Sequence, residues 1–305
     1  MASPTSSEVL VSGNKSTVVR PMMAPAPIQQ AFKLLEAVSP NLALHWLNRL
    51  FAQPKRHRYP LEEKQLLAQA SKKTHYLLGM PNPSWDFKPV VSYRWSTPNA
   101  QARVLLMHGW EGRATQFYAF VPALLAAGFD VLAVDAPAHG ASPGRWSSLF
   151  HFSRALTRVV NGAGGVDAAI THSFGGPSLI HAMSEGLRVQ KSVLISPPVR
   201  VTDYTQILCD AVGVSAALRE RLHMHWQNKL GVILNSLDAG KFAQQLTTRA
   251  LVIHDLHDKE VAFSAGREIA EQWPNAQLIT TTDLGHRRIL KDENVVRQSV
   301  EFLLS

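Results

Sequence analysis

The chain contains a single cysteine, Cys209, among 305 residues. One cysteine cannot form an intrachain disulfide, so the fold does not depend on an oxidising compartment. The sequence also lacks an apolar run of the roughly 18 residues that a membrane-spanning helix needs. Residues 1–15 place Glu8 ahead of any positive charge and have no compact apolar core before a small-residue cleavage site. These absences predict a globular cytoplasmic protein.

Acidic residues are the scarcer charged type, with 23 Asp and Glu against 31 Lys and Arg, a net charge of +8. Clustered cations attract phosphates, yet no basic strand with interleaved aromatics and no nucleic-acid module is present, so we expect no nucleic-acid partner. Residues 1–60 alone carry seven cations and two acids. Trp46, Phe51 and nearby cations in residues 41–58 make weak membrane-surface contact one hypothesis. A helix packed on the main domain and followed by a solvated basic loop is favoured over it.

Hydrophobic residues make up 46% of the chain and charged residues 18%, which is typical of a protein with a sizeable buried core. Residues 1–27 are rich in Ser, Thr, Ala and Pro and are predicted to be a flexible tail. Residues 28–72 are predicted to be an N-terminal helical extension, because apolar residues recur there at three and four positions. Residues 73–305 are predicted to form the main domain.

The main domain alternates short apolar runs with helical patterns. The runs predict strands at 90–95, 103–108, 130–134, 168–171, 191–196, 251–254 and 277–281, and the patterns predict helices at 118–127, 148–160, 177–186, 263–273 and 294–304. Such βαβ alternation predicts an α/β fold, with a mostly parallel central sheet and helices on both faces. After Pro197-Pro198, helical patterns at 204–218 and 220–235 interrupt the alternation. We interpret residues 199–248 as a helical cap over a site, because ligands of open α/β sheets bind beyond the strand ends.

A strand-to-helix segment at residues 168–176 ends in His172-Ser173-Phe174-Gly175-Gly176. This context is typical of a nucleophile elbow, in which a serine stands on a sharp turn. A serine hydroxyl needs a base, and that base needs an acid to orient it. Asp258 and His286 both follow predicted strands, in the order that α/β-hydrolases use. Asp255 and Glu260 lie in the same loop as Asp258 and are competing candidates for the acid.

Together these segments resemble the serine α/β-hydrolase superfamily, of the esterase or lipase type with a helical cap. The resemblance rests on five motifs in the family's order: residues 105–110, 134–142, 171–176, 253–261 and 284–286. It implies an eight-stranded type of sheet, Ser173 as nucleophile, His286 as base and Asp258 as orienting acid. It also implies an oxyanion hole from the backbone N–H groups of Trp110 and Phe174. Thr171 departs from the family's pattern, which has glycine there.

The predicted activity is hydrolysis of a carboxylic ester or thioester through an acyl-serine, with a small-molecule acyl substrate and no cofactor. An acyltransferase or perhydrolase using the same triad, and a non-catalytic ligand-binding protein of the same fold, are the alternatives. A metal site at His254, Asp255, His257 and Asp258 is disfavoured, because their order does not match the helical H-E-x-x-H arrangement. His108, His172 and His254 are interpreted as structural residues at strand ends. No feature of the sequence indicates an oligomeric state.

Overall fold

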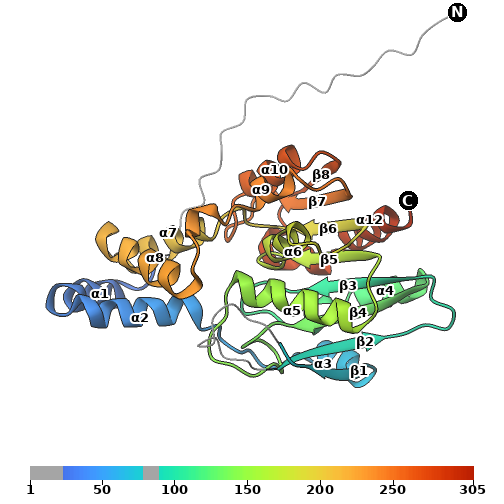
Figure 1. The fold of residues 1–305 in the computed structure, drawn as a ribbon, viewed down its shortest axis with the longest axis horizontal. Coiled ribbons are helices and arrows are strands. Elements are labelled where there is room, and N and C mark those ends of the chain that lie inside the picture. The colour runs from blue at the N-terminus through green and yellow to red at the C-terminus, as the bar shows by residue number, and fades with distance from the viewer. Residues whose placement is uncertain (1–22, 78–88) are drawn as a thin grey trace, which may run out of the picture.

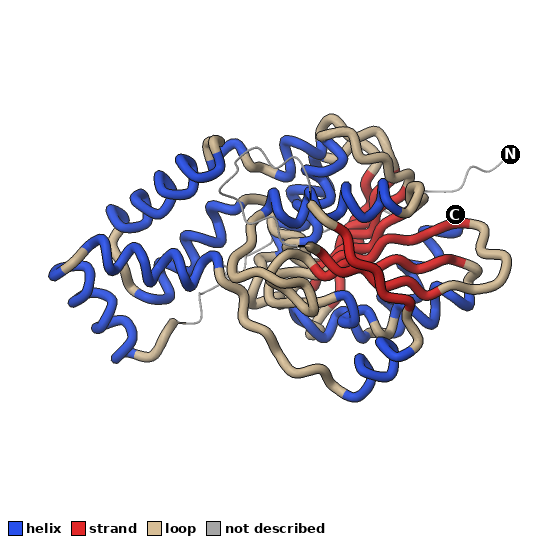
Figure 2. The backbone as a smooth tube through the Cα atoms, turned by 60° about the horizontal axis from the view of Figure 1, so that its bottom comes forward, coloured by secondary structure: helices blue, strands red, loops and turns tan. Residues whose placement is uncertain are grey.

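The computed structural model describes residues 23–77 and 89–305, and its centre is an eight-stranded sheet (Figures 1 and 2). The strand order is β1-β2-β4-β3-β5-β6-β7-β8. The strands are β1 (Ser71–His75), β2 (Val90–Trp95), β3 (Ala102–Met107), β4 (Phe129–Asp135), β5 (Ala168–His172), β6 (Lys191–Ile195), β7 (Arg249–Asp255) and β8 (Ala276–Thr281). Strands β3 to β8 run parallel, whereas β2 is antiparallel to both β1 and β4. The predicted α/β fold with a mostly parallel sheet is therefore confirmed.

The seven predicted strands correspond to β2 to β8, with ends shifted by at most two residues. Their apolar runs arise because both faces of the sheet are covered, so consecutive side chains are all buried. In β3, for example, Leu105 and Met107 pack into one core, and Val104 and Leu106 into the core on the other face. Strand β1 was not predicted. It is an edge strand of sequence Ser-Lys-Lys-Thr-His with four exposed residues, so it has no apolar pattern.

Helices cover both faces of this sheet (Figure 2). One core contains side chains of α5 (Leu149–Gly162), α6 (Gly175–Ser184), α9 (Ala239–Ala243) and α10 (Phe263–Gln272). The other contains side chains of α3 (Leu61–Ala68), α4 (Phe120–Ala126), α12 (Glu293–Leu304) and the 3₁₀ turns η1 (Ala114–Phe117) and η3 (Ile289–Lys291). A short helix, α11 (Gly285–Arg288), precedes η3. Turn η1 is an addition to the predicted elements, whereas α3 lies within the segment predicted to be a helical extension.

Between β6 and β7 the chain forms α7 (Val201–Val212), α8 (Ala216–Leu230), the turn η2 (Leu234–Ser236) and α9. The predicted helices 204–218 and 220–235 had wrong ends. Gly213 and Gly231 adopt left-handed backbone angles, with φ of 71° and 72°, and end α7 and α8. Glycine takes this conformation without steric cost, which makes it a frequent helix stop. Ser215 then caps the start of α8 by accepting a hydrogen bond from the backbone N–H of Leu218.

Helices α1 (Ala26–Val38) and α2 (Pro40–Ala52) pack against α7 and α8, at the left of Figure 1. Phe32, Ala43 and Leu47 from the first pair are buried in one apolar cluster with Leu222 and Trp226 from α8. The indole Nε1 of Trp226 also donates to Oδ1 of Asn48 at 2.8 Å. We call these four helices the helical layer. It is built from two segments that lie about 150 residues apart in the chain.

The part of the chain that the structure describes, residues 23–77 and 89–305, has no helix with the length and apolar character needed to cross a bilayer. The lone cysteine, Cys209, is buried on α7 in the apolar cluster of the helical layer. Burial raises the pKa of its thiol to about 11. The thiol is therefore protonated and unreactive at neutral pH.

Trp226→Ala should destabilise the helical layer, because it opens a cavity and leaves Asn48 without its indole donor. Large-to-small changes of this kind cost about 3–5 kcal/mol. We expect faster hydrogen exchange at the amides of α1, α2 and α8, with little change in the strands of the sheet. Met224→Ala on the same helix, where the side chain is 46% exposed, is the matched control and should change little. Unchanged exchange in α1 and α2 of the Trp226 variant would contradict the packing described.

Candidate active site

Ser173 occupies the turn between β5 and α6, and its backbone has a φ of 50°. This left-handed conformation is unusual for a residue other than glycine and costs about 1–3 kcal/mol. The turn is held by two backbone hydrogen bonds, from the N–H of Ser173 to the carbonyl of Ile195 at 2.8 Å and from Gly176 to Ser173 at 2.9 Å. A strained serine between a strand and a helix is the geometry that a nucleophile elbow requires.

Two glycines give this turn the room it needs. A Cβ on Gly175 would lie 2.5 Å from the carbonyl oxygen of Met107, and one on Gly109 would lie 2.7 Å from Cβ of Ser173. Thr171, by contrast, is fully buried as a strand residue, and its hydroxyl lies 3.4 Å from the carbonyl of Val193. The tight approaches are thus made at Gly109 and Gly175, and the β-branched Thr171 fits because it stands within the strand.

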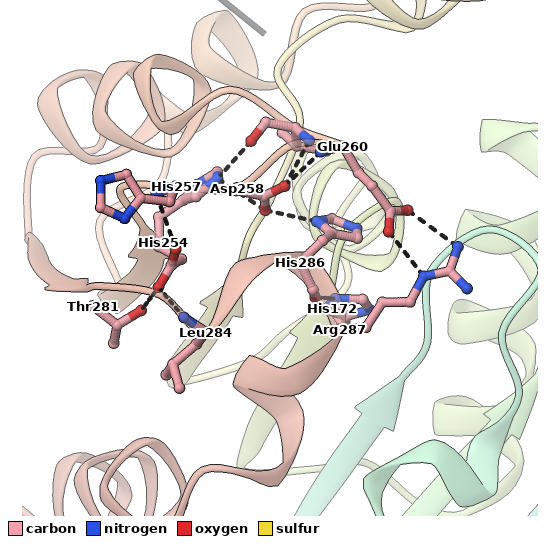
Figure 3. Close-up of polar contacts among 11 residues, drawn as sticks. His172, His254, His257, Asp258, Glu260, Thr281, Leu284, His286 and Arg287 are labelled. Carbon is pink, nitrogen blue, oxygen red and sulfur yellow. Dashed lines mark hydrogen bonds and ion pairs between the residues drawn. The ribbon is translucent and has the colours of Figure 1, made fainter. Parts of the chain in front are cut away.

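Asp258 and His286 meet at the ends of β7 and β8 (Figure 3). Nδ1 of His286 donates to Oδ2 of Asp258 at 2.7 Å, and both residues are buried. The other oxygen, Oδ1, accepts from the backbone N–H groups of Glu260 and Val261 at 2.8 and 2.9 Å. Because Nδ1 carries the donated proton, Nε2 of the neutral ring is left as the basic nitrogen. This is the arrangement that a base and its orienting acid need.

The charge of Asp258 is stabilised although the side chain is buried. Burial by itself would raise its pKa, but hydrogen bonds from His254 and His286 lower the pKa below the ordinary aspartate value. The backbone N–H of Val261 acts in the same direction. The carboxylate is therefore ionised at neutral pH and can offset the positive charge of a protonated His286.

The two other acids of this loop have different partners. Asp255 accepts from Oγ1 of Thr281 at 2.8 Å and from the backbone N–H groups of Leu284 and His257 at 3.0 and 2.9 Å. Glu260 forms an exposed ion pair with Arg287, with oxygen–nitrogen distances of 2.9 and 3.2 Å. Of the three candidates in the described residues, Asp258 is the one that contacts the His286 ring.

Asp255 also connects the two loops that carry Asp258 and His286. Its bonds to Thr281 and Leu284 cross from the end of β7 to the turn after β8 (Figure 3). That turn contains two left-handed residues, Asp283 with a φ of 62° and Gly285 with a φ of 64°. Hydrogen bonds from the turn therefore fix the position from which His286 extends. This role was not predicted, because the sequence offered Asp255 only as a competing candidate for the acid or as a metal ligand.

Two further histidines contact the pair. Nε2 of His172 donates to the backbone carbonyl of His286 at 2.8 Å, and the two ring centroids are 4.7 Å apart. Burial lowers the pKa of His172 to about 3, so this ring stays neutral beside His286. Nε2 of His254 lies 3.1 Å from the carbonyl of Val261 and 3.5 Å from Oδ2 of Asp258. Both were predicted to be structural residues. His172 contacts the backbone of the candidate base, and His254 contacts the carboxylate of the candidate acid.

Ser173 and His286 line one cavity of about 670 Å³. Trp110 and Phe174 line it too, with ring centroids 5.6 Å apart. Among the described residues, the backbone N–H groups of Trp110 and Phe174 donate to no protein acceptor. Two free N–H groups beside a serine are suited to bind a developing negative charge.

The helical layer supplies much of the apolar wall of this cavity, namely Phe51, Tyr204, Ile207, Trp226 and Leu230, and the segment around η2 adds Leu234 and Leu237. Charged side chains also line the cavity, among them Glu111, Glu260 and Arg287. Phe51 comes from the N-terminal extension, outside the stretch that resembles the family. The sequence analysis missed it as a pocket residue, because no local pattern shows that α2 packs beside α7 and α8.

Two of the four residues considered as metal ligands have partners outside that set. His257 is exposed and contacts Asp283, whereas Asp255 turns toward Thr281 and Leu284. Within residues 23–77 and 89–305, no group of three or more His, Cys, Asp or Glu side chains is placed to hold a metal ion.

Comparison with known proteins agrees with this geometry. Residues 104–229 match the sequence model of the alpha/beta hydrolase family. Similar solved structures include the esterase Pf2001 from Pyrococcus furiosus, with a TM-score of 0.59 and 20% identity over 82% of this chain and 98% of that one. Another is Est1E from Butyrivibrio proteoclasticus, with a TM-score of 0.58 and 18% identity over 76% and 97%. No curated protein sequence matches the chain.

A monoacylglycerol lipase from Paleococcus ferrophilus has the same fold, with a TM-score of 0.56 and 20% identity over 70% of this chain and 97% of that one. At such identities the structures establish the fold, and the family model adds the sequence pattern. The resemblance is thus confirmed: the chain has the α/β-hydrolase fold, and residues 104–229 match the sequence model of that family.

Asp255→Asn should weaken the turn that carries His286, because an amide nitrogen would face N–H donors. We expect the free energy of unfolding at pH 7 to fall by about 1–3 kcal/mol. Hydrogen bonds lower the folded pKa of Asp255 against the effect of burial. Its stabilisation is therefore complete above the ordinary aspartate pKa of about 4 and is lost as the pH falls through the folded pKa.

Urea unfolding at pH 7 and at pH 3 measures this difference. The stability gap between the wild type and the Asp255 variant should narrow at the lower pH. Asp283→Asn is the control, because that side chain lies in the same turn but is exposed and pairs only with His257 at the surface. A gap of equal size at both pH values would contradict the assigned role of the Asp255 charge.

Proposed function

We propose that the protein is a serine hydrolase that cleaves a carboxylic ester or thioester through an acyl-serine intermediate. The observation that carries this proposal is the 2.7 Å hydrogen bond from His286 to Asp258, because His286 lines the same cavity as the strained Ser173. The proposed catalytic residues are Ser173, His286 and Asp258. The match of residues 104–229 to the sequence model of the alpha/beta hydrolase family supports the reaction class.

In the proposed mechanism, Oγ of Ser173 attacks the substrate carbonyl carbon while Nε2 of His286 takes the hydroxyl proton. Asp258 stabilises the resulting imidazolium through the hydrogen bond at Nδ1. The carbonyl oxygen becomes an oxyanion, which the N–H groups of Trp110 and Phe174 bind. His286 then gives its proton to the leaving alkoxide or thiolate as the acyl–oxygen or acyl–sulfur bond breaks. Water, activated by the same ring, releases the acid and restores Ser173.

The oxyanion site is supported by the close approach of the β3 loop to the serine. Gly109 stands where a side chain would strike Ser173, so the following N–H, that of Trp110, can lie near the reacting carbonyl. Phe174 is the residue after the nucleophile, the position from which such folds take their other donor. Removing one donor of this kind typically costs about 10²–10³ in rate.

The proposed substrate is a small molecule with an apolar acyl part. Phe51, Trp226 and Leu230 place aromatic and aliphatic surface in the cavity, and burial of such a surface favours hydrocarbon chains. We propose that the helical layer acts as the cap that sets the accepted chain length. A panel of p-nitrophenyl esters and acyl thioesters of increasing chain length tests this. We expect the highest kcat/KM for an acyl chain longer than acetyl.

A fluorophosphonate probe should label the wild type and fail to label Ser173→Ala. Ser184→Ala, a serine at the other end of α6, is the control and should be labelled normally.

Asp258→Asn should lower kcat for ester hydrolysis by about 10³–10⁴, because His286 would lose the acceptor that holds its tautomer. Folded wild-type protein without labelling or turnover would overturn the proposal in favour of a non-catalytic binding protein. Transfer of the acyl group to an added alcohol in preference to water would identify an acyltransferase.

A further inference from the structure

Helices α1 and α2 form a hairpin whose outer surface is apolar and exposed. Leu34 and Val38 are 67% and 76% exposed, and Leu42, Trp46 and Leu50 are 46%, 45% and 39% exposed. We call these five residues the hairpin face. Scattered exposed apolar residues are common, whereas a set gathered on two packed helices marks an interaction site.

The spacing of these residues places them in one exposed stripe on each helix. Leu42, Trp46 and Leu50 recur every four positions, so they form one stripe along α2. Leu34 and Val38 are likewise four apart at the end of α1, and Ser39 alone separates the two helices. Figure 1 shows both helices along the lower edge of the helical layer, to one side of the sheet.

The hairpin face is separate from the surface that holds the fold together. The buried residues Phe32, Ala43 and Leu47 are the ones that pack against α7 and α8. Polar substitutions on the hairpin face should therefore leave the fold intact, and the apolar residues there need a reason other than core packing.

The sequence of the hairpin and the loop after it carries more positive than negative charge, and Arg49, Arg56 and Arg145 line one pocket at the C-terminal end of α2. Residues 23–58 contain five Lys and Arg, namely Lys33, Arg49, Lys55, Arg56 and Arg58, against one acid, Glu36. Glu36 accepts hydrogen bonds from Ser215 on the side facing α8. The guanidinium of Arg49 lies 5.3 Å from the centre of the Trp46 ring. An apolar stripe with a tryptophan and bordering cations is the composition of helices that lie in the headgroup region of a bilayer.

We propose that the hairpin face docks on a membrane surface that contains anionic lipids. Its apolar side chains would enter the interface, and its cations would meet the lipid phosphates. The sequence suggested residues 41–58 for such contact, and the structure extends the surface to the end of α1. A second copy of the chain would bring like charges toward one another, so the charge favours an anionic lipid surface as the occupant.

Docking would also place the cavity near the lipid. Phe51, which follows Leu50 on α2, lines the cavity that contains Ser173. The docking proposal does not depend on the proposed hydrolysis, because the hairpin face and its charges stand apart from Ser173, Asp258 and His286.

Cosedimentation with vesicles tests the proposal without any substrate. The full chain should bind vesicles of 70% phosphatidylcholine and 30% phosphatidylglycerol, and bind less to phosphatidylcholine alone or at high salt. The double variant Leu34→Asn, Trp46→Asn should bind at least about tenfold more weakly. The control is Leu61→Asn, Leu304→Asn, which removes two exposed leucines elsewhere, 67% and 60% exposed, and should bind like the wild type.

Circular dichroism and light scattering complete the test. Wild-type protein that binds neither vesicle, or a folded hairpin variant that binds as well as the control, would overturn the proposal. A dimer of the wild type that the hairpin variant converts to a monomer would show that the face joins two copies, and would overturn it too. Wild-type protein that binds vesicles but hydrolyses no ester would contradict the proposed function, and the docking proposal would still hold.

Discussion

The left-handed backbone at Ser173 is the constraint on which the site depends. A serine with a φ of 50° is held there by the strand before it, the helix after it and a hydrogen bond to Ile195. The packing of β5 and α6 in the core offsets the free-energy cost of this backbone conformation. Gly109 and Gly175 are the positions where a side chain would collide with the turn or its neighbour strand.

A second constraint is the link between the loops after β7 and β8. The Asp258–His286 hydrogen bond joins residues 28 positions apart, and Asp255 adds bonds to Thr281 and Leu284 across the same gap. His172 at the end of β5 and His254 in β7 contact the pair. All of these side chains lie at or shortly after the end of a parallel strand. The sheet therefore brings the pair together, and the hydrogen bonds fix its orientation.

The helical layer shows how a cavity can be formed by segments that are remote in sequence. Helix α2 contributes Phe51 and α8 contributes Trp226 to the same wall, and their rings are in contact, with centroids 5.7 Å apart. The N-terminal extension is thus part of the cavity wall as well as the carrier of the hairpin face. One element serves packing on its inner side and offers an apolar surface on its outer side.

The sequence by itself determined the parallel sheet and the candidate residues, because buried strands need continuous apolar runs and the elbow and the loops after β7 and β8 have local patterns. It did not reveal β1, whose exposed edge position needs no apolar residue, or the ends of α7 and α8 at Gly213 and Gly231. Only the tertiary structure decided among Asp255, Asp258 and Glu260, since the choice depends on which carboxylate meets His286 in space. The pairing of α2 with α8 was decided in the same way, because an amphipathic helix shows that it has a buried side without showing which partner covers it.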